Sequence, residues 1–278
     1  MDWLDAVILG IVQGLTEFLP ISSSAHVSIV GQLIGNADPG AAFTAIIQIG
    51  TETAVIVYFR KDIARIIKAW CLALVGKIDR GDPDAKMGWL VIIGSIPIVV
   101  LGLLLQDSID SVFRNLWLTA AMLAGFGLVI GVVDSLAKHT RPLESLTWKH
   151  GILFGLAQSL ALIPGVSRSG GTITAGLAMG YKREAAARYS FLLAIPAVMG
   201  AGFYQLYEAL SGGEQIAWGP TILATLVAGV IGFLMVAWLL KFISSHSFWP
   251  FVWYRLGVAA VVAVLLLTNV LDPLASAP

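Results

Sequence analysis

Two short polar clusters interrupt long apolar stretches of this chain, and both contain side chains that can do chemistry. The first cluster, Gln13–His26, holds one glutamate and a run of three serines: Glu17, Ser22, Ser23 and Ser24. The second cluster, Pro164–Thr172, is centred on Arg168. A carboxylate, a hydroxyl and an imidazole can together attack a phosphorus centre and move the proton, while a guanidinium binds the anion. The pattern therefore favours chemistry on an anionic substrate.

The acidic side chain of the first cluster is Glu17. It stands four residues after Gln13, so a helix carries both side chains on one face. A carboxylate inside a membrane segment costs roughly 2.5–3.5 kcal/mol on insertion scales and is seldom without a role. We expect Glu17 to act as a general base, or as a metal ligand together with Gln13. The alternative is a hydrogen bond that only stabilises the local hairpin.

The serine run follows Pro20, a position where serine also caps the start of a helix. His26 lies three residues after Ser23, which permits a contact between hydroxyl and imidazole. Histidine can accept or donate a proton near neutral pH. We therefore predict Ser23 and His26 as catalytic residues and Ser22 as a substrate contact, with helix capping as the alternative for the serines.

The second cluster is predicted to bind an anion. A lone guanidinium at Arg168 would be expensive in an apolar segment, and it fits phosphate in a bidentate manner. The donors around it are two serines, a glycine amide and a threonine: Ser167, Ser169, Gly170 and Thr172. Glycines let amides face an anion, and the start of a following helix adds a favourable dipole. The alternative is an Arg168–Glu17 ion pair that joins the two clusters, and both can hold in the resting state.

Glu52 is a further carboxylate within an apolar run, next to Thr51 and one turn after Gln48. Two interpretations stay open, because Glu52 can line a cavity or pair with a neighbouring helix.

The composition indicates that the segments carrying these residues lie in a membrane. The chain has 278 residues, of which 58% are hydrophobic and 12% charged, whereas soluble domains are near 45–50% and about 25%.

The charge balance and the cysteine count exclude further classes of protein. Seventeen basic and 17 acidic residues leave no net charge, so the chain lacks the excess of basic residues that is typical of nucleic-acid-binding proteins. The single cysteine, Cys71, excludes an intramolecular disulfide framework and a cysteine metal cluster.

A helix needs roughly 20 apolar residues to cross a bilayer. Six runs meet this length, at 41–59, 87–105, 116–137, 188–207, 219–241 and 251–271. The polar clusters interrupt two further stretches, 3–34 and 150–181, whose apolar arms are too short to cross alone. Each is predicted to form a re-entrant hairpin. We therefore expect an all-α, polytopic membrane protein with six full spans.

Basic residues in the connections set the predicted orientation. The connections 60–86, 138–149 and 241–255 are rich in Lys and Arg and should be cytoplasmic, whereas 106–115 and 208–214 should be external. Both termini are then extracytoplasmic. Asp2 and Asp5 stand where a signal peptide would be basic, so no cleaved signal is expected.

The two broken stretches resemble each other. Gly10–Gln13 matches Gly155–Gln158, and Pro20–Ser23 matches Pro164–Ser167. Three spans follow each stretch, so residues 1–145 and 146–278 form two repeats of opposite orientation in a single domain. Inverted repeats with broken helices are typical of secondary transporters, and they would bring the two hairpin tips together.

At these two clusters the chain resembles the undecaprenyl-diphosphate phosphatase family, the integral-membrane bacitracin-resistance type. Its signatures are a Glu or Gln four residues before Glu17, then the Pro20–His26 segment, and the Pro164–Thr172 segment. The resemblance implies hydrolysis of undecaprenyl diphosphate to the monophosphate and phosphate. This reaction recycles the lipid carrier of cell-wall synthesis at the extracytoplasmic face of the bacterial plasma membrane and confers bacitracin resistance. A divalent cation, Mg²⁺ or Ca²⁺, is implied, although Gln13 leaves one carboxylate where the family signature allows two.

The mechanism leaves alternatives open at this stage. Ser23 or a water attacks the terminal phosphorus, and His26 or Glu17 accepts the proton. The rival function is transport of a polyprenyl phosphate lipid, with Arg168 holding the head group. In both cases the partner is a polyprenyl lipid, and the oligomeric state, a homodimer among the alternatives, is not determined.

Overall fold

The computed structural model describes residues 1–35, 41–105, 115–211 and 216–274. These ranges are helical and contain no strand, only a single bridge between Arg141 and Tyr181. Six helices correspond to the predicted spans: α3 (Ala41–Tyr58), α5 (Pro83–Leu104), α7 (Leu116–Leu136), α10 (Arg183–Ser211), α11 (Trp218–Ile243) and α12 (Trp249–Leu267). By length and composition five of the described helices can cross a membrane, and α3 makes a sixth when it is counted with the helix that follows it. The prediction of an all-α polytopic membrane protein is confirmed.

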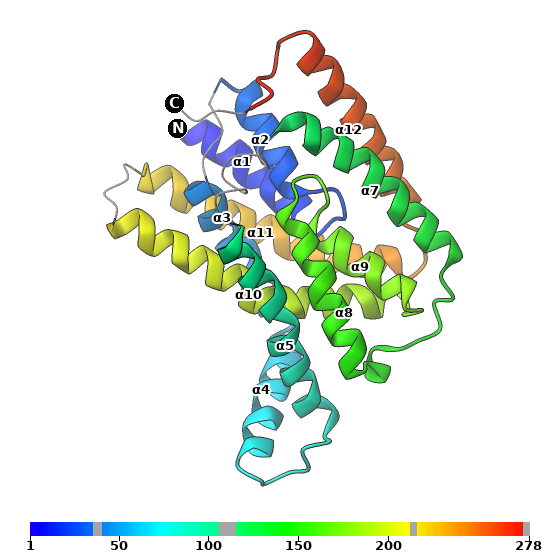
Figure 1. Cartoon of the computed structure of the whole chain (residues 1–278). Helices are drawn as coiled ribbons and strands as arrows, with labels where there is room; N and C mark the ends of the chain where they lie inside the picture. Colours follow the sequence, from blue (N-terminus) through cyan, green and yellow to red (C-terminus); the bar gives the residue numbers. More distant parts are fainter. Residues whose placement is uncertain (36–40, 106–114, 212–215, 275–278) are drawn as a thin grey trace.

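One helix was not predicted. Residues 60–86 are expected to form a basic connection, but the structure has α4 (Arg60–Leu74) there, bent by 79° from α3. Its basic side chains point outward, while Ile66 is buried, so the segment is an amphipathic helix and not a loop. Arg65 pairs with Asp62 at 3.0 Å and with Asp84 of α5 at 2.8 Å. Figure 1 shows α4 and the first part of α5 projecting together from the body.

The two broken stretches form helical hairpins. The first consists of α1 (Trp3–Thr16) and α2 (Ser23–Leu33), and the second of α8 (Trp148–Ser159), the short η3 (Leu160–Leu162) and α9 (Arg168–Ala178). The first hairpin begins where α11 begins, since the Trp3 ring packs against Gly219. The second begins where α5 begins, since Lys86 donates to the carbonyl of Leu146 at 2.6 Å. The hairpins therefore enter the fold from opposite ends (Figure 1).

Each hairpin is held by a close contact between helix backbones. A Cβ atom at Gly10 of α1 would lie 2.6 Å from the carbonyl oxygen of Ala224 in α11. At Gly155 of α8 it would lie 2.4 Å from the carbonyl oxygen of Gly94 in α5. Real Cβ atoms do not come this close, so only glycine allows these helices to pack at this distance. Gly10 and Gly155 are also the two glycines that align with each other when the two broken stretches are compared in sequence.

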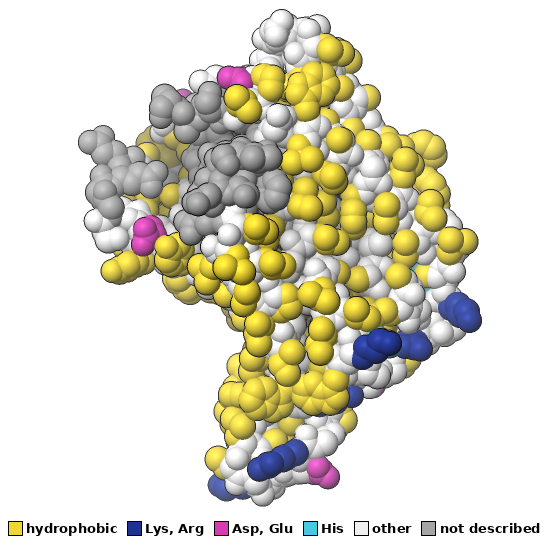
Figure 2. All heavy atoms as spheres, viewed as in Figure 1, with side chains coloured by type: hydrophobic (Ala, Val, Ile, Leu, Met, Phe, Trp, Pro, Cys, Tyr) yellow, Lys and Arg dark blue, Asp and Glu magenta, His cyan; other side chains and the backbone are white. Residues whose placement is uncertain are grey.

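The two ends of the molecule differ in charge. The end that contains α4 holds every described Lys and Arg except Arg168 and Arg255, and Figure 2 shows the basic side chains gathered there. We refer to the end of the molecule that contains α4 as the basic end. Asp134 at the end of α7 connects three elements there, because it accepts hydrogen bonds from Arg183 at 2.6 Å and from the Phe248 amide at 2.9 Å. The start of α1 and the last described residues lie at the opposite end.

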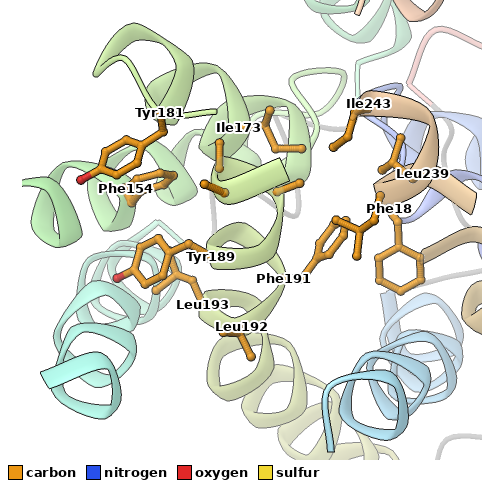
Figure 3. Close-up of a cluster of buried hydrophobic side chains, with 14 of the residues drawn as sticks. Phe18, Phe154, Ile173, Tyr181, Tyr189, Phe191, Leu192, Leu193, Leu239 and Ile243 are labelled. Carbon is orange, nitrogen blue, oxygen red and sulfur yellow. The ribbon is translucent and has the colours of Figure 1, made fainter. Parts of the chain in front are cut away.

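The main core surrounds α9 and α10 (Figure 3). Phe18, in the tip of the first hairpin, meets Phe191 of α10 edge to face with ring centroids 5.5 Å apart. Phe154 of α8 meets Tyr189 of α10 in the same manner at 4.8 Å. Such aromatic pairs prefer one relative orientation. They fix both hairpins against α10 and so set the positions of the two tips.

Candidate active site

The tips of the two hairpins meet inside the molecule. Each returning helix starts after a serine with positive φ, 71° at Ser22 and 77° at Ser167. The Ser167 hydroxyl caps α9 by accepting from the Gly170 amide at 3.1 Å, while the Ser22 side chain makes no cap bond. Capping thus explains Ser167 but not Ser22. By backbone conformation, Ser22 in the first tip corresponds to Ser167 in the second. The sequence match of the two stretches instead aligns Ser23 with Ser167, so the two correspondences differ by one residue.

Glu17 is the centre of the contacts between the tips. Its Oε2 accepts from the Ser23 hydroxyl at 2.6 Å and from the Gln13 amide at 2.7 Å. Its Oε1 accepts from Arg168 Nη2 at 2.7 Å. The carboxylate is buried, with 4% of the side chain exposed. The ion pair between Glu17 and Arg168 that the sequence offered as an alternative is present.

These groups form one wall of a cavity of about 600 Å³. Its polar wall consists of Glu17, Ser22, Ser23, Ser24, Gln48, Ser167 and Arg168. The remaining wall comes from α5, η3 and α10 and is largely apolar, apart from Tyr204 and Gln205 of α10. Its small residues are Gly102, Ala161, Ala197, Gly200 and Ala201. A cavity that is polar at one side and apolar at the other suits an amphiphilic ligand.

His26 differs from its expected placement, because it does not contact Ser23. Its Nδ1 lies 2.7 Å from the Ser22 carbonyl oxygen and its Nε2 lies 2.9 Å from the Tyr254 hydroxyl. A carbonyl oxygen only accepts, so Nδ1 carries the proton and, in the neutral ring, Nε2 accepts from Tyr254. The ring stacks on Tyr254 of α12 and does not line the cavity. The residue that reaches the Ser23 hydroxyl is Glu17.

Three of the predicted substrate contacts lie in the tip but not at the cavity. Ser169 donates to the Leu19 carbonyl at 3.0 Å, and the Gly170 amide donates to Ser167. Thr172 donates to the Arg168 carbonyl at 2.8 Å and shares a hydrogen bond with the hydroxyl of Ser190. These groups hold the tip together. Of the predicted substrate contacts, Ser22 and Ser167 are those that the structure places at the cavity.

Arg255 is a residue whose importance the sequence reasoning missed. The sequence places it in the predicted basic connection 241–255, but in the structure it lies inside α12 with no exposed surface. Its guanidinium donates to five carbonyl oxygens, those of Pro20, Met122, Leu123, Gly165 and Val166, at 2.6–3.2 Å. Because Pro20 and Gly165 belong to different hairpins, Arg255 fastens the two tips to each other. An arginine this far inside an apolar run was the available signal.

Glu52 of α3 also belongs to this region. Its carboxylate is fully buried and Oε2 lies 3.6 Å from Arg168 Nη2. Neither oxygen has a hydrogen-bond partner among the described residues. Glu52 does not line the cavity. Of the two interpretations left open by the sequence, the structure favours pairing with a neighbouring element.

The fold and the site together define a class of protein: a polytopic membrane protein in which two re-entrant hairpins bring a carboxylate, a hydroxyl and a guanidinium to a partly apolar cavity. The chain belongs to the family of bacitracin resistance protein BacA, whose model matches residues 6–261. The family resemblance seen in the two motifs is thus confirmed.

The chain is similar to several proteins over nearly its whole length. It is 63% identical to the undecaprenyl-diphosphatase of Renibacterium salmoninarum, over 96% of each chain. It is 61% identical to that of Pseudarthrobacter chlorophenolicus, over 96% of this chain and 98% of the relative. It is 55% identical to undecaprenyl-diphosphatase 2 of Streptomyces coelicolor, over 98% of each chain.

Proposed function

We propose that this protein hydrolyses undecaprenyl diphosphate to undecaprenyl phosphate and inorganic phosphate, and so recycles the lipid carrier and confers bacitracin resistance. The observation that carries the proposal is the contact of Ser23 and Arg168 with the same carboxylate, Glu17, at the wall of one cavity. The relatives that bear the name undecaprenyl-diphosphatase support it.

The geometry supports Ser23 as the nucleophile and Glu17 as the base. Ser23 Oγ attacks the terminal phosphorus while Glu17 Oε2, at 2.6 Å, takes its proton. The bond from this phosphorus to the bridging oxygen breaks, and undecaprenyl phosphate leaves with that oxygen, to which Glu17 returns the proton. A water activated by Glu17 then hydrolyses the phosphoserine and releases inorganic phosphate. Arg168 stabilises charge on the transferred group, the main contribution in phosphoryl transfer.

A divalent cation fits the residues at this site. Gln13 Oε1 is buried and has no hydrogen-bond partner among the described residues, and Glu17 lies one turn away. Carboxylate and amide oxygens are ligands that Mg²⁺ and Ca²⁺ prefer, and Mg²⁺ is often held by one or two carboxylates plus a substrate phosphate. Gln13 and Glu17 would hold the cation, which would neutralise charge on the diphosphate.

The apolar wall of the cavity accounts for the lipid part of the substrate. Gly102 of α5 and Gly200 of α10 line it, and a Cβ atom at Gly200 would meet nothing within 4 Å. We propose that the prenyl chain lies between these helices and leaves toward the bilayer. The small residues leave room for the methyl-branched isoprene units next to the phosphate groups.

We also propose the orientation and the repeat. Basic residues favour the cytoplasmic side, so the basic end faces the cytoplasm and both termini are extracytoplasmic. The cavity lies against the halves of α5 and α10 that are remote from the basic end, which supports access from the extracytoplasmic side. The matching glycines Gly10 and Gly155, and the matching positive φ of Ser22 and Ser167, support two inverted repeats over 1–145 and 146–278.

Phosphate release by the purified protein in detergent tests the function. The native protein should release phosphate from a long-chain prenyl diphosphate, and a chelator should reduce the rate. Ser23→Ala and Glu17→Gln should each lower kcat at least about 10²-fold. Ser135→Ala, a change at an exposed serine of α7 near the basic end, is the matched control and should retain activity.

The outcomes separate the alternatives. Binding of the lipid without phosphate release would indicate a transporter and would reject the proposal. A trapped phosphoserine at Ser23 supports serine attack. Both routes put an oxygen of water into the phosphate, so the trapped adduct decides between them: phosphate release without any phosphoserine at Ser23 indicates direct attack by water.

A further inference from the structure

Two carboxylates, not one, face the guanidinium of Arg168. Glu17 approaches Nη2 from the first hairpin at 2.7 Å, and Glu52 approaches the same nitrogen from α3 at 3.6 Å. The side chain of Glu52 has no exposed surface, and neither of its oxygens accepts a hydrogen bond from a described residue. The distance from Nη2 is too long for a hydrogen bond but within the range of an ion pair.

A fully buried carboxylate without hydrogen bonds is strongly destabilising unless a counter-charge lies close. Among the described residues, the positive charge within ion-pair distance of Glu52 is that of Arg168, which also pairs with Glu17. The three side chains carry one net negative charge when ionised. Such an arrangement is difficult to explain by packing alone, since a fold gains nothing from a second acid at a position that an apolar side chain could fill.

The proposed reaction explains the second acid. Arg168 binds Glu17 in the structure described, and the same Arg168 must stabilise the phosphate while Glu17 takes the Ser23 proton. The contact between Arg168 and Glu17 must therefore loosen during turnover. If Glu17 were the sole counter-charge, a desolvated guanidinium would oppose that change.

The part of α3 that carries Glu52 is held in a fixed position by tight packing against α11. Gly50, two residues earlier, packs against the backbone of Thr225 in α11, where a Cβ atom would come within 2.1 Å of the carbonyl oxygen. This contact fixes α3 against α11. Glu52 also does not line the cavity, so substrate does not compete for it.

We infer that Glu52 is a positioning residue, which holds Arg168 by its charge from the α3 side so that Arg168 can leave Glu17 and contact the transferred phosphate. The inference rests on the proposed function and assigns a role to a residue outside the two hairpins. Without the charge at 52, Arg168 stays on Glu17, and both phosphate binding and proton acceptance become worse.

The test moves the second carboxylate to another helix. Gln13 of α1 donates to Glu17 at 2.7 Å, so a carboxylate at position 13 lies next to the same Glu17–Arg168 pair. The variants are Glu52→Gln, which has the same size without charge, and Glu52→Gln combined with Gln13→Glu. Each is measured for kcat and KM of phosphate release and for its unfolding temperature.

We expect Glu52→Gln to lower kcat/KM by about 10-fold or more, through both kcat and KM, because Arg168 is misplaced. The combined variant should recover most of that loss. A structural role would lower the unfolding temperature without rescue from position 13. The inference is overturned by a Glu52→Gln protein within threefold of native kcat/KM, or by a combined variant no better than Glu52→Gln alone.

A second measurement does not depend on activity. Arg168→Met and Glu52→Gln, alone and together, form a cycle of unfolding temperatures. Coupled residues give a double variant that is clearly more stable than the sum of the single effects predicts, whereas additive effects contradict the contact. A native protein that releases no phosphate would reject the proposed function, and this cycle would still report on the Glu52–Arg168 pair.

Discussion

Replacement of Arg255 by Met should separate the two hairpin tips. Methionine keeps the length and apolar character of the side chain stem but removes the guanidinium. Five carbonyl oxygens lose their donor, among them those of Pro20 in the first hairpin and Gly165 in the second. The change therefore acts on the alignment of the tips and not on a group that touches substrate.

The size of the effect follows from these contacts. The carbonyls of Met122 and Leu123 lie within α7 and keep their helical amide donors. A buried acceptor left without a partner costs about 1–3 kcal/mol, which for the other three carbonyls is about 3–9 kcal/mol. Removal of a buried guanidinium recovers part of this, since its desolvation is itself unfavourable by several kcal/mol. We expect a net loss of about 3–5 kcal/mol, comparable with that of breaking other buried charged contacts. The unfolding temperature should fall by roughly 6–20 °C for a chain of this size.

The assay pairs thermal unfolding, followed by tryptophan fluorescence, with phosphate release well below the unfolding temperature. A displacement of about 1 Å at the tips lowers kcat about 10²-fold, so Arg255→Met should be nearly inactive while still folded. Arg255→Lys restores a charge with fewer and differently placed donors and should lie between the two. An Arg255→Met protein that keeps its unfolding temperature within 2 °C and its activity within threefold would refute the reasoning.

The remaining predictions concern the cavity wall and the second tip. Gly200→Leu should fill the apolar wall and lower kcat/KM about 10-fold or more for a long-chain prenyl diphosphate, with little change for one of a single isoprene unit. Gly125→Leu is the matched control, because Gly125 also meets nothing within 4 Å but lies on the exposed side of α7; equal effects of both changes on both substrates would place the prenyl chain elsewhere. Thr172→Val removes the buried hydroxyl contact with Ser190 and should cost about 1–3 kcal/mol of stability, with kcat and KM within threefold. A raised KM at unchanged unfolding temperature would instead make Thr172 a substrate contact.

The spans and hairpins of this fold could be predicted because the membrane makes strong demands on sequence. A bilayer allows few polar residues in a crossing helix, so apolar length identifies α5, α7, α10, α11 and α12. The interruptions at Pro20 and Pro164 locate the tips for the same reason. Helix α4 could not be separated from a loop on this basis, because it lies outside the apolar runs and packs against α5 through contacts such as that of Trp70 with Trp89, whose ring centroids are 5.5 Å apart.

The contacts of the candidate site could be predicted less well than the spans. Within the first hairpin, the sequence left Glu17 and His26 as alternative bases for Ser23, and spacing predicted a contact with His26 that the structure does not have. The partners that come from distant spans could not be predicted. His26 turns to Tyr254, 228 residues later, and Arg255 and Glu52 reach the tips from α12 and α3. A histidine next to a serine in sequence gives no information about which helix packs over it.

The pairing of Arg168 with Glu17 also explains how a charged site can exist in a membrane before substrate arrives. A free guanidinium and a free carboxylate would each be expensive there, but at 2.7 Å they neutralise each other. A diphosphate head carries more negative charge than one carboxylate and offers bidentate contacts, so it can replace Glu17 at Arg168. Glu17, relieved of its partner, then has the Ser23 hydroxyl at 2.6 Å as its closest proton source. In the proposed mechanism, substrate binding itself thus prepares the base, and a neutral prenyl alcohol that lacks phosphate should leave the pair closed.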